Sequence, residues 1–198
     1  MDRSSSIHFA TNRCRAEQCL AGRYVPKRVH QHPVARLLWV AIGVAAGASL
    51  ALALVALPAT PFFLASLGGS AVFLFGLTQA PAAQPRALLG GHLGGAFIGI
   101  ACYQLSGDAL WVYALAQVLA LSFMLLTKSV HPPAGANPLL MVYVHAGWSA
   151  LLQPVLIGVL ALAGVAVVWS RLFPGLVHYP VAWFERSPSS TFWGGWRE

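Results

Sequence analysis

The sequence predicts an all-α protein, a polytopic bundle of transmembrane helices, and three observations support this prediction. The 198 residues are 58% hydrophobic and only 9% charged, whereas about 25% of the residues in a soluble domain are charged. Several apolar stretches are long enough to cross about 30 Å of hydrocarbon. Basic side chains stand at the ends of these stretches rather than inside them. The net charge of +7 therefore indicates membrane topology rather than a surface for nucleic acid.

We expect residues 1–35 to be a basic, largely disordered arm on the cytoplasmic side. No apolar run in this arm fits a signal peptide. Cys14 and Cys19 lie in the arm, and their spacing matches no standard zinc pattern. We therefore predict no metal site and no cofactor.

Residues 36–171 form the predicted transmembrane domain, which contains about four long helices. Arg36 precedes the first of them, so the positive-inside rule places the N-terminus in the cytoplasm. The predicted long helices are residues 37–57, 87–105, 109–127 and 151–170.

Two shorter apolar segments, residues 62–77 and 132–149, are broken by glycine or proline. Proline removes a backbone donor and pushes the preceding residue out of helical geometry. We therefore expect the second segment to open at residues 131–133 and again near Asn137. Open backbone at membrane depth is tolerated only where protein covers it or where it lines a wet cavity. The alternative is a plain turn in which proline starts a helix.

The short segments either cross the membrane or re-enter it, and the charges favour crossing. Six crossings from a cytoplasmic N-terminus place Arg86, Lys128 and Arg171 on the cytoplasmic side and Asp108 outside. Re-entrant segments would leave Arg86 and Lys128 outside, against the charge rule. We therefore predict six membrane segments, two of them short.

The two halves of the domain share a layout of long helix, short broken segment and long helix. Gly69-Ser70-Ala71 corresponds to Gly135-Ala136-Asn137, and Gln84-Pro85 corresponds to Gln153-Pro154. We hypothesise an inverted 3+3 repeat, an arrangement in which transporters place their substrate site between corresponding broken helices.

The helix at residues 87–105 carries Gly91, Gly95 and Gly99 at a spacing of four. Small residues on one face let another helix approach closely. We predict a packing face that serves either within the chain or between the chains of a homo-oligomer.

Residues 172–198 form the third predicted part, a tail that holds Tyr179, Trp183, Trp193 and Trp196 among polar residues. Aromatic residues favour the membrane interface, so we expect an interfacial segment. The alternative is a loose terminus.

The chemistry predicted for the bundle is the attraction of an anion. Asp108 is its only acidic residue, whereas cation and proton pathways usually depend on intramembrane carboxylates. Broken helices offer free N–H groups and positive dipole ends to an anion. The alternative roles are packing for His92 and interfacial anchoring for Arg86 and Lys128. The predicted substrate-binding residues are Ser70, Gln84, Arg86, His92, Lys128, His131, Gly135 and Asn137, and the predicted structural residues are Gly69, Gly91, Gly95, Pro132 and Pro133.

Three motifs carry a resemblance to a known family: His131-Pro132-Pro133-Ala134-Gly135-Ala136, Gly69-Ser70-Ala71-Val72, and Ala83-Gln84-Pro85-Arg86 with Gly90-Gly91-His92. In these motifs the chain resembles the HPP family of integral membrane proteins over roughly residues 34–173. The resemblance implies transport, because cyanobacterial and chloroplast members are assigned nitrite transport. The chain departs from the family pattern at Ala87-Leu88 and at Asn137-Pro138, beside the predicted site.

We therefore expect a multi-pass protein of the bacterial cytoplasmic (inner) membrane that contacts the lipid bilayer and carries a small anion, with nitrite as the first candidate. The alternative is a non-transporting membrane sensor or a subunit of a larger complex. The sequence contains no nucleophile elbow, phosphate-binding loop or metal-spaced His/Glu cluster, so we predict no enzymatic activity and no catalytic residue.

Overall fold

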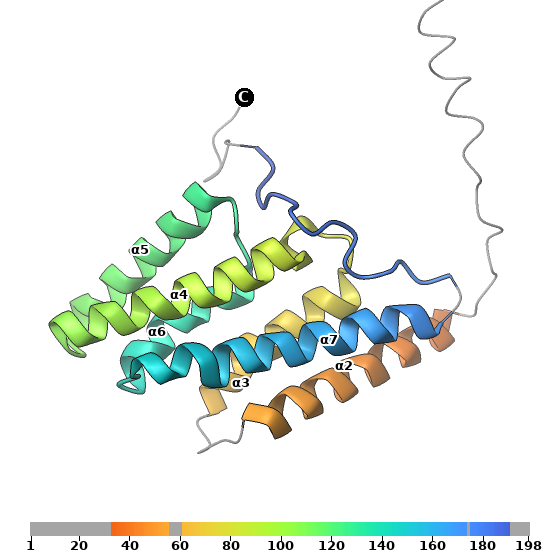
Figure 1. Cartoon of the computed structure of the whole chain (residues 1–198), viewed down its shortest axis with the longest axis horizontal. Coiled ribbons are helices and arrows are strands. Elements are labelled where there is room, and N and C mark those ends of the chain that lie inside the picture. Colours follow the sequence, from red (N-terminus) through yellow and green to blue (C-terminus); the bar gives the residue numbers. More distant parts are fainter. Residues whose placement is uncertain (1–32, 56–60, 174, 191–198) are drawn as a thin grey trace, which may run out of the picture. The chain divides into compact units, whose positions relative to one another are not determined.

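The computed structural model describes residues 33–55, 61–173 and 175–190, except for the side chains of residues 61–64. This part of the chain is built from helices (Figure 1). Nearly all of the predicted arm lies outside the described residues. Four helical stretches are long and apolar enough to cross a membrane: Pro33–Val55, Pro85–Ser106, Leu110–Thr127 and Trp148–Leu172. The predicted all-α transmembrane bundle is confirmed.

The long helices match the predicted ones closely. They are α2 (Pro33–Val55), α4 (Pro85–Ser106), α5 (Leu110–Thr127) and α7 (Ile157–Leu172). Proline starts both α2 and α4, where its missing N–H costs nothing. The 22 residues of α4 give a length of about 33 Å. Two short turns, η4 (Trp148–Leu151) and η5 (Leu152–Leu156), lead into α7.

The two short segments are also present, and both are broken. The first is α3 (Pro61–Ala71), which continues as the π-helical turn η1 (Val72–Gly76). A short 3-10 turn, η2 (Pro81–Ala83), joins it to α4. The second begins with an extended His131, continues as the 3-10 turn η3 (Pro132–Gly135) and ends as α6 (Ala136–Tyr143).

The predicted second opening near Asn137 is wrong. Asn137 and Pro138 lie in the first turn of α6. The first residues of a helix have no intrahelical acceptor for their N–H groups, so proline fits there without breaking the helix.

Consecutive segments run in alternating directions (Figure 1). Residues 129–146 run beside α4 from its start towards its end. A Cβ added at Gly91 would lie 3.0 Å from the Cβ of His131, and one at Gly99 would lie 2.5 Å from the carbonyl oxygen of Pro138. The glycine face predicted for α4 therefore packs within the chain, against the second short segment.

The contacts between the long helices agree with the division of the domain into two similar halves. The first long helix of one half packs on the last long helix of the other half, since α2 contacts α7 and α5 contacts α4. The two halves do not pack identically, because the short segment α6 packs extensively on α4, whereas the corresponding α3 contacts α7 only slightly. This arrangement supports the hypothesis of an inverted repeat with a divergent second short segment.

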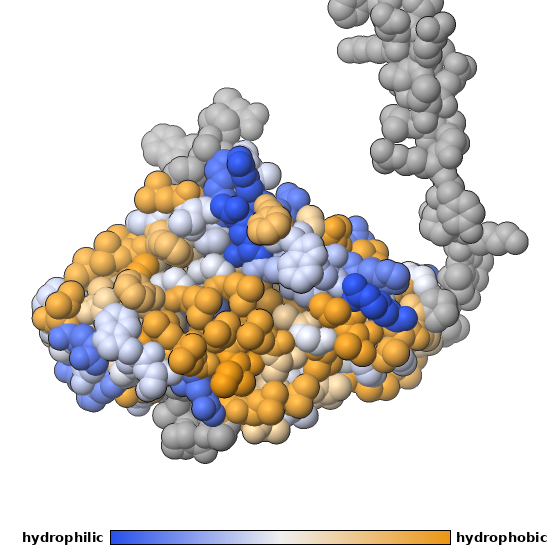
Figure 2. Space-filling model, viewed as in Figure 1, coloured by the Kyte–Doolittle hydropathy of each residue, from blue (hydrophilic) through white to orange (hydrophobic). Residues whose placement is uncertain are grey.

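Apolar side chains cover much of the helix surface (Figure 2). Leu38, Leu119 and Val168 are among the exposed large hydrophobic residues. Leu74 and Leu162 belong to a core of buried residues between α2, α3 and α7. An apolar exterior around a packed core is expected for helices in contact with lipid.

The two ends of the bundle differ in charge. The Arg86 guanidinium donates to the carbonyl oxygen of Thr127 (2.7 Å), next to Lys128. Arg171 lies in the last turn of α7 and donates to the carbonyl of Tyr179 in the tail (2.9 Å), which also binds Gln84 near the start of α4. At the opposite end His145 Nε2 lies 2.9 Å from the Asp108 carboxylate. We call the first of these the cation end.

The described part of the tail crosses the cation end. The Tyr179 amide donates to Ser170 Oγ (2.9 Å), and the amide of Val130 donates to the carbonyl of Ser187 (2.7 Å). Between these points, Gln84 binds the tail with its side-chain oxygen, which accepts from the amides of Val181 (2.9 Å) and Ala182 (3.2 Å).

We predict that Gly99→Ala destabilises the fold by about 1–3 kcal/mol, because the added methyl group meets backbone atoms that cannot rotate away. The matched control is Gly164→Ala in α7, where nothing lies within 4 Å of the new Cβ. This control should be neutral or stabilising by up to about 1 kcal/mol. The measurement is the temperature at which the purified protein loses its monodisperse elution peak. Equal heat stability of the two variants would contradict the close approach at Gly99.

We also predict that Gln84→Leu releases the tail from the bundle. The Gln84 amide donates to the carbonyls of Thr78 (2.8 Å) and Ala80 (3.1 Å) as well as accepting from the tail. Leucine removes all four of these hydrogen bonds, at about 1 kcal/mol for each lost bond, although the Ala80 carbonyl still accepts from the amide of Ala83. Hydrogen exchange at the Val181 and Ala182 amides should become at least about tenfold faster. Exposed Gln79 offers the control Gln79→Leu, and unchanged exchange in the Gln84 variant would show that other contacts hold the tail.

Candidate functional site

Five polar side chains meet inside the bundle where both short segments contact α4. They are at most 3% exposed. Such groups are costly to bury unless each finds a hydrogen-bond partner. We call this group the buried polar cluster; it consists of Ser66, Ser70, His92, His131 and Asn137.

Ser70 lies at the centre of the cluster. Its hydroxyl oxygen is 2.7 Å from His92 Nε2, 2.8 Å from His131 Nε2 and 2.9 Å from the carbonyl oxygen of Ser66. A single hydroxyl therefore joins two imidazole rings that come from different segments of the chain.

The protonated nitrogen of His131 follows from its neighbours. His131 Nδ1 is 2.6 Å from the carbonyl oxygen of Ala82, and a carbonyl oxygen only accepts. Nδ1 therefore carries the hydrogen, and Nε2 of the neutral ring presents a lone pair to Ser70.

The same reasoning assigns His92. The Asn137 side-chain nitrogen lies 3.0 Å from the carbonyl oxygen of His92 and 3.0 Å from His92 Nδ1. The carbonyl requires the NH₂ group at that position, so the second hydrogen of the amide points at Nδ1. Nδ1 accepts this hydrogen, and Nε2–H of His92 donates to Ser70.

Prolines and glycines bring these side chains together. Pro132 follows His131 and keeps it extended, at φ −124° and ψ 102°, which turns the imidazole into the bundle. A Cβ on Gly69 would lie 3.0 Å from the Pro133 ring, so only glycine lets α3 approach η3 this closely. Gly91 gives α4 the same closeness to His131.

His131 lies in the connection between α5 and α6, outside the four long helices. Its ring is fully buried, and its two nitrogens lie 2.6 Å from the Ala82 carbonyl oxygen and 2.8 Å from the Ser70 hydroxyl. A buried ring without a carboxylate beside it is held as the neutral imidazole.

Four of the eight predicted substrate-binding residues are thus in the cluster: Ser70, His92, His131 and Asn137. The structure places the other four elsewhere. All four hydrogen-bonding positions of the Gln84 amide are taken by backbone groups, those of Thr78 and Ala80 and of the tail. A Cβ on Gly135 would meet nothing closer than Gln117 Nε2, at 3.8 Å.

Arg86 and Lys128 lie together at the cation end. Arg86 Nε is buried and has no hydrogen-bond partner in the described part of the chain. Lys128 ends α5 with a left-handed backbone, at φ 52° and ψ 47°. Glycine is the usual residue in that conformation, since other residues are strained there by about 1 kcal/mol. Two adjacent cations, one of them with a buried N–H that lacks a partner among the described residues, make this end a candidate site for an anion.

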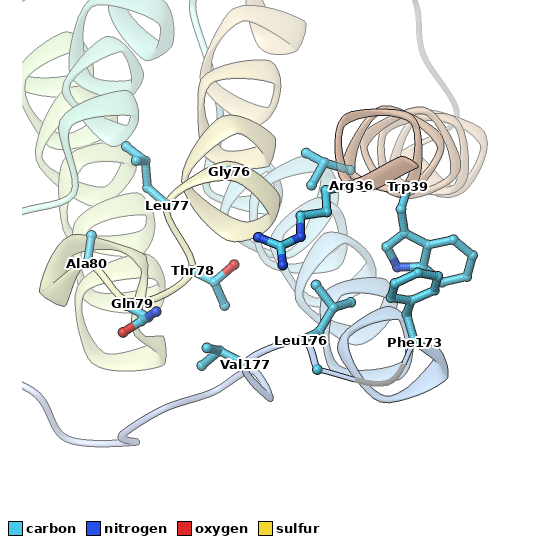
Figure 3. Close-up of a pocket in the computed structure, with 12 residues that line it drawn as sticks. Arg36, Trp39, Gly76, Leu77, Thr78, Gln79, Ala80, Phe173, Leu176 and Val177 are labelled. Carbon is cyan, nitrogen blue, oxygen red and sulfur yellow. The ribbon is translucent and has the colours of Figure 1, made fainter. Parts of the chain in front are cut away.

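A cavity of about 530 Å³ opens at the cation end. Figure 3 shows the Arg36 side chain reaching into it between Thr78 and Leu176. Its lining extends along the chain to Ala80, two residues before the carbonyl that holds His131. A cavity that contains one arginine side chain therefore ends two residues before the carbonyl that accepts from His131.

Sequence reasoning missed two polar groups near the site. Ser66 donates to the carbonyl of Pro133 (3.2 Å) and lies 3.3 Å from His92 Nδ1. Its spacing of four from Ser70 placed both serines on one face of α3, a usable signal. Gln117 of α5 holds a buried side-chain oxygen that lacks a partner among the described residues, and no local pattern pointed to it.

Comparison with known proteins agrees with this architecture. A transmembrane protein of Dictyostelium discoideum is 35% identical over 133 residues, which are 63% of this chain and 42% of that protein. A second transmembrane protein of the same organism is 34% identical over 127 residues, which are 60% of this chain and 44% of that protein. The match spans less than half the length of either relative.

No solved structure matches the chain. The family model described as "HPP, transmembrane region" matches residues 29–180, which include helices α2 to α7 and the whole buried polar cluster. The chain belongs to the HPP family of transmembrane proteins.

Proposed function

We propose that the protein is an integral membrane transporter or channel for a small anion, with nitrite as the first candidate. The observation that carries this proposal is the buried polar cluster, which forms where the two broken segments meet α4. Polar side chains buried at membrane depth are costly and are commonly retained for function. Nitrite comes first because the HPP resemblance implies it.

The composition of the cluster favours an anion over a cation. Its side chains offer hydroxyl, amide and imidazole N–H donors, which can replace part of the hydration shell of an anion. The helices and turns that carry the cluster residues contain no aspartate or glutamate. Asp108 is exposed and lies beside His145 at the opposite end of the bundle. Entry of the anion exchanges hydrogen bonds within the cluster for bonds to the substrate.

The positive charges at the cation end would attract the anion before it enters the bundle. Arg86, Lys128 and Arg171 lie there, and Arg36 reaches into the cavity. A surface with several cations raises the local concentration of an anion and its rate of association. By the positive-inside rule this end faces the cytoplasm, in a cytoplasmic membrane with the N-terminus inside.

The test is uptake of labelled nitrite into sealed liposomes that contain the purified full chain. Competition by nitrate, formate and chloride ranks the substrates. Protein-free liposomes are needed because nitrous acid crosses lipid unaided. We predict saturable flux that falls about tenfold or more in Asn137→Ala, which loses a hydrogen-bond donor worth about 1–1.5 kcal/mol. Arg86→Gln should lower the flux at low substrate concentration.

His145→Gln is the matched control, because this imidazole is exposed at the opposite end of the bundle, and its flux should stay within about twofold of wild type. Wild-type flux in both Asn137→Ala and Arg86→Gln would remove these residues from the pathway. Flux no faster than through protein-free liposomes, with protein shown to be folded, would favour a non-transporting membrane sensor or subunit.

A further inference from the structure

We infer that the buried polar cluster binds one proton together with the transported anion, and that Nε2 of His131 holds this proton. The inference rests on the proposed function and extends it. The chain moves the anion and the proton in the same direction, so that the net cargo is the neutral acid. No bond other than the N–H bond at His131 forms or breaks.

The Ser70 hydroxyl allows the cluster to accept a proton without losing a hydrogen bond. Its single hydrogen has two acceptors in reach, His131 Nε2 at 2.8 Å and the carbonyl oxygen of Ser66 at 2.9 Å. With His131 neutral, the hydroxyl donates to Nε2, and the Ser66 carbonyl keeps the backbone bond of its helix.

Protonation reverses this bond. Nε2–H of His131 then donates to Ser70, and the hydroxyl turns towards the Ser66 carbonyl. The Ser70 oxygen still accepts from His92 Nε2–H, since a hydroxyl has two lone pairs. The polar atoms of Ser70 and His131 therefore have hydrogen-bond partners whether His131 is neutral or protonated. A histidine that only fills space in a core needs partners for one of these states alone.

The charge of the added proton, in contrast, has no carboxylate partner on the described elements around it. No carboxylate lies on the elements that pack around the ring, which are α3, η1, η2, α4, η3 and α6. The Phe73 ring, not a charged group, meets the edge of His131. The ionisable residues on these elements, besides the two histidines, are Arg86, Cys102, Tyr103 and Tyr143.

None of these groups supplies a negative charge beside His131. Arg86 is itself a cation, and it donates to the end of α5. Cys102 packs among apolar residues of α5 and α6, and Tyr103 stacks on His145 at the opposite end. On α5, its C-cap and the described part of the tail, the ionisable residues are Tyr113, Lys128, His178, Tyr179, Glu185 and Arg186, and α7 adds Arg171 in its last turn.

Glu185 is the one carboxylate among the described residues of these segments, and it is partly exposed and precedes the exposed Arg186. Within the part of the chain that the structure describes, no carboxylate therefore compensates an imidazolium at His131 before an anion enters. Because a buried charge is costly unless paired, the anion favours the proton and the proton favours the anion by the same factor. The site thus binds the two together more readily than either alone.

The test is a titration of the full chain, labelled with ¹⁵N-histidine and ¹⁵N-asparagine, in lipid nanodiscs. Nitrite, nitrate and formate are added in turn at pH 7 and pH 6. Imidazole ¹⁵N shifts distinguish a bare ring nitrogen from a protonated one, and His131→Gln identifies the signal. We predict that a saturating anion converts His131 Nε2 from bare to protonated, and that anion affinity rises about tenfold for each unit of pH lost.

His145 and His178 are internal controls, whose signals should follow pH but not the anion. If the Asn137 amide shifts saturably while His131 stays neutral and anion affinity does not depend on pH, the site binds an anion without a proton. This outcome would contradict the proton-binding inference but not the proposed anion site. The absence of saturable shifts for all three anions would overturn both proposals.

Two serine variants sharpen the test. Ser70→Ala removes the acceptor for Nε2–H, so anion affinity should lose its dependence on pH. Ser66→Ala is the matched control, because its hydroxyl touches His92 and Pro133 but not His131, and the pH dependence should persist. The same pH dependence in both variants would contradict the role of the Ser70 hydroxyl.

Discussion

The hydrogen-bonding demand of one buried ring ties the two short segments to the long helices. His92 is 1% exposed, so both of its ring nitrogens need a partner inside the protein. The first short segment supplies Ser70 at 2.7 Å to Nε2, and the second supplies Asn137 at 3.0 Å to Nδ1. The prolines and glycines around the cluster serve this arrangement, because they let three backbones approach one ring.

The family likeness and the geometry describe the molecule at different levels. Membership of the HPP family covers the membrane-spanning architecture, which the two Dictyostelium transmembrane proteins share in part. The proposed anion pathway depends instead on the chemistry of the cluster and on the charge asymmetry between the two ends. The same cluster would be an unusual way to hold a purely structural turn together, because an apolar contact would suffice there.

Hydrophobic length and proline placement were enough to predict the six segments and the break at His131, since both act locally on the backbone. Four site residues were predicted because the breaks had to face one another. Pro138 was misread because its effect depends on its position within a helical turn. The role of Gln84 could not be predicted, because its tail partners lie 97 and 98 residues away. No local pattern reports such a distant contact.

The glycine face of α4 also limits how the bundle can move. At Gly99 the neighbouring backbone comes so close that a Cβ would lie 2.5 Å from a carbonyl oxygen. Surfaces in such contact resist sliding past each other, because packed interiors transmit displacement rather than absorb it. If access to the site alternates between the two sides, α4 and residues 129–141 move as one rigid body. The rocking partner is then the α2–α7 pair, and the hinges lie in the connections that join it to that body.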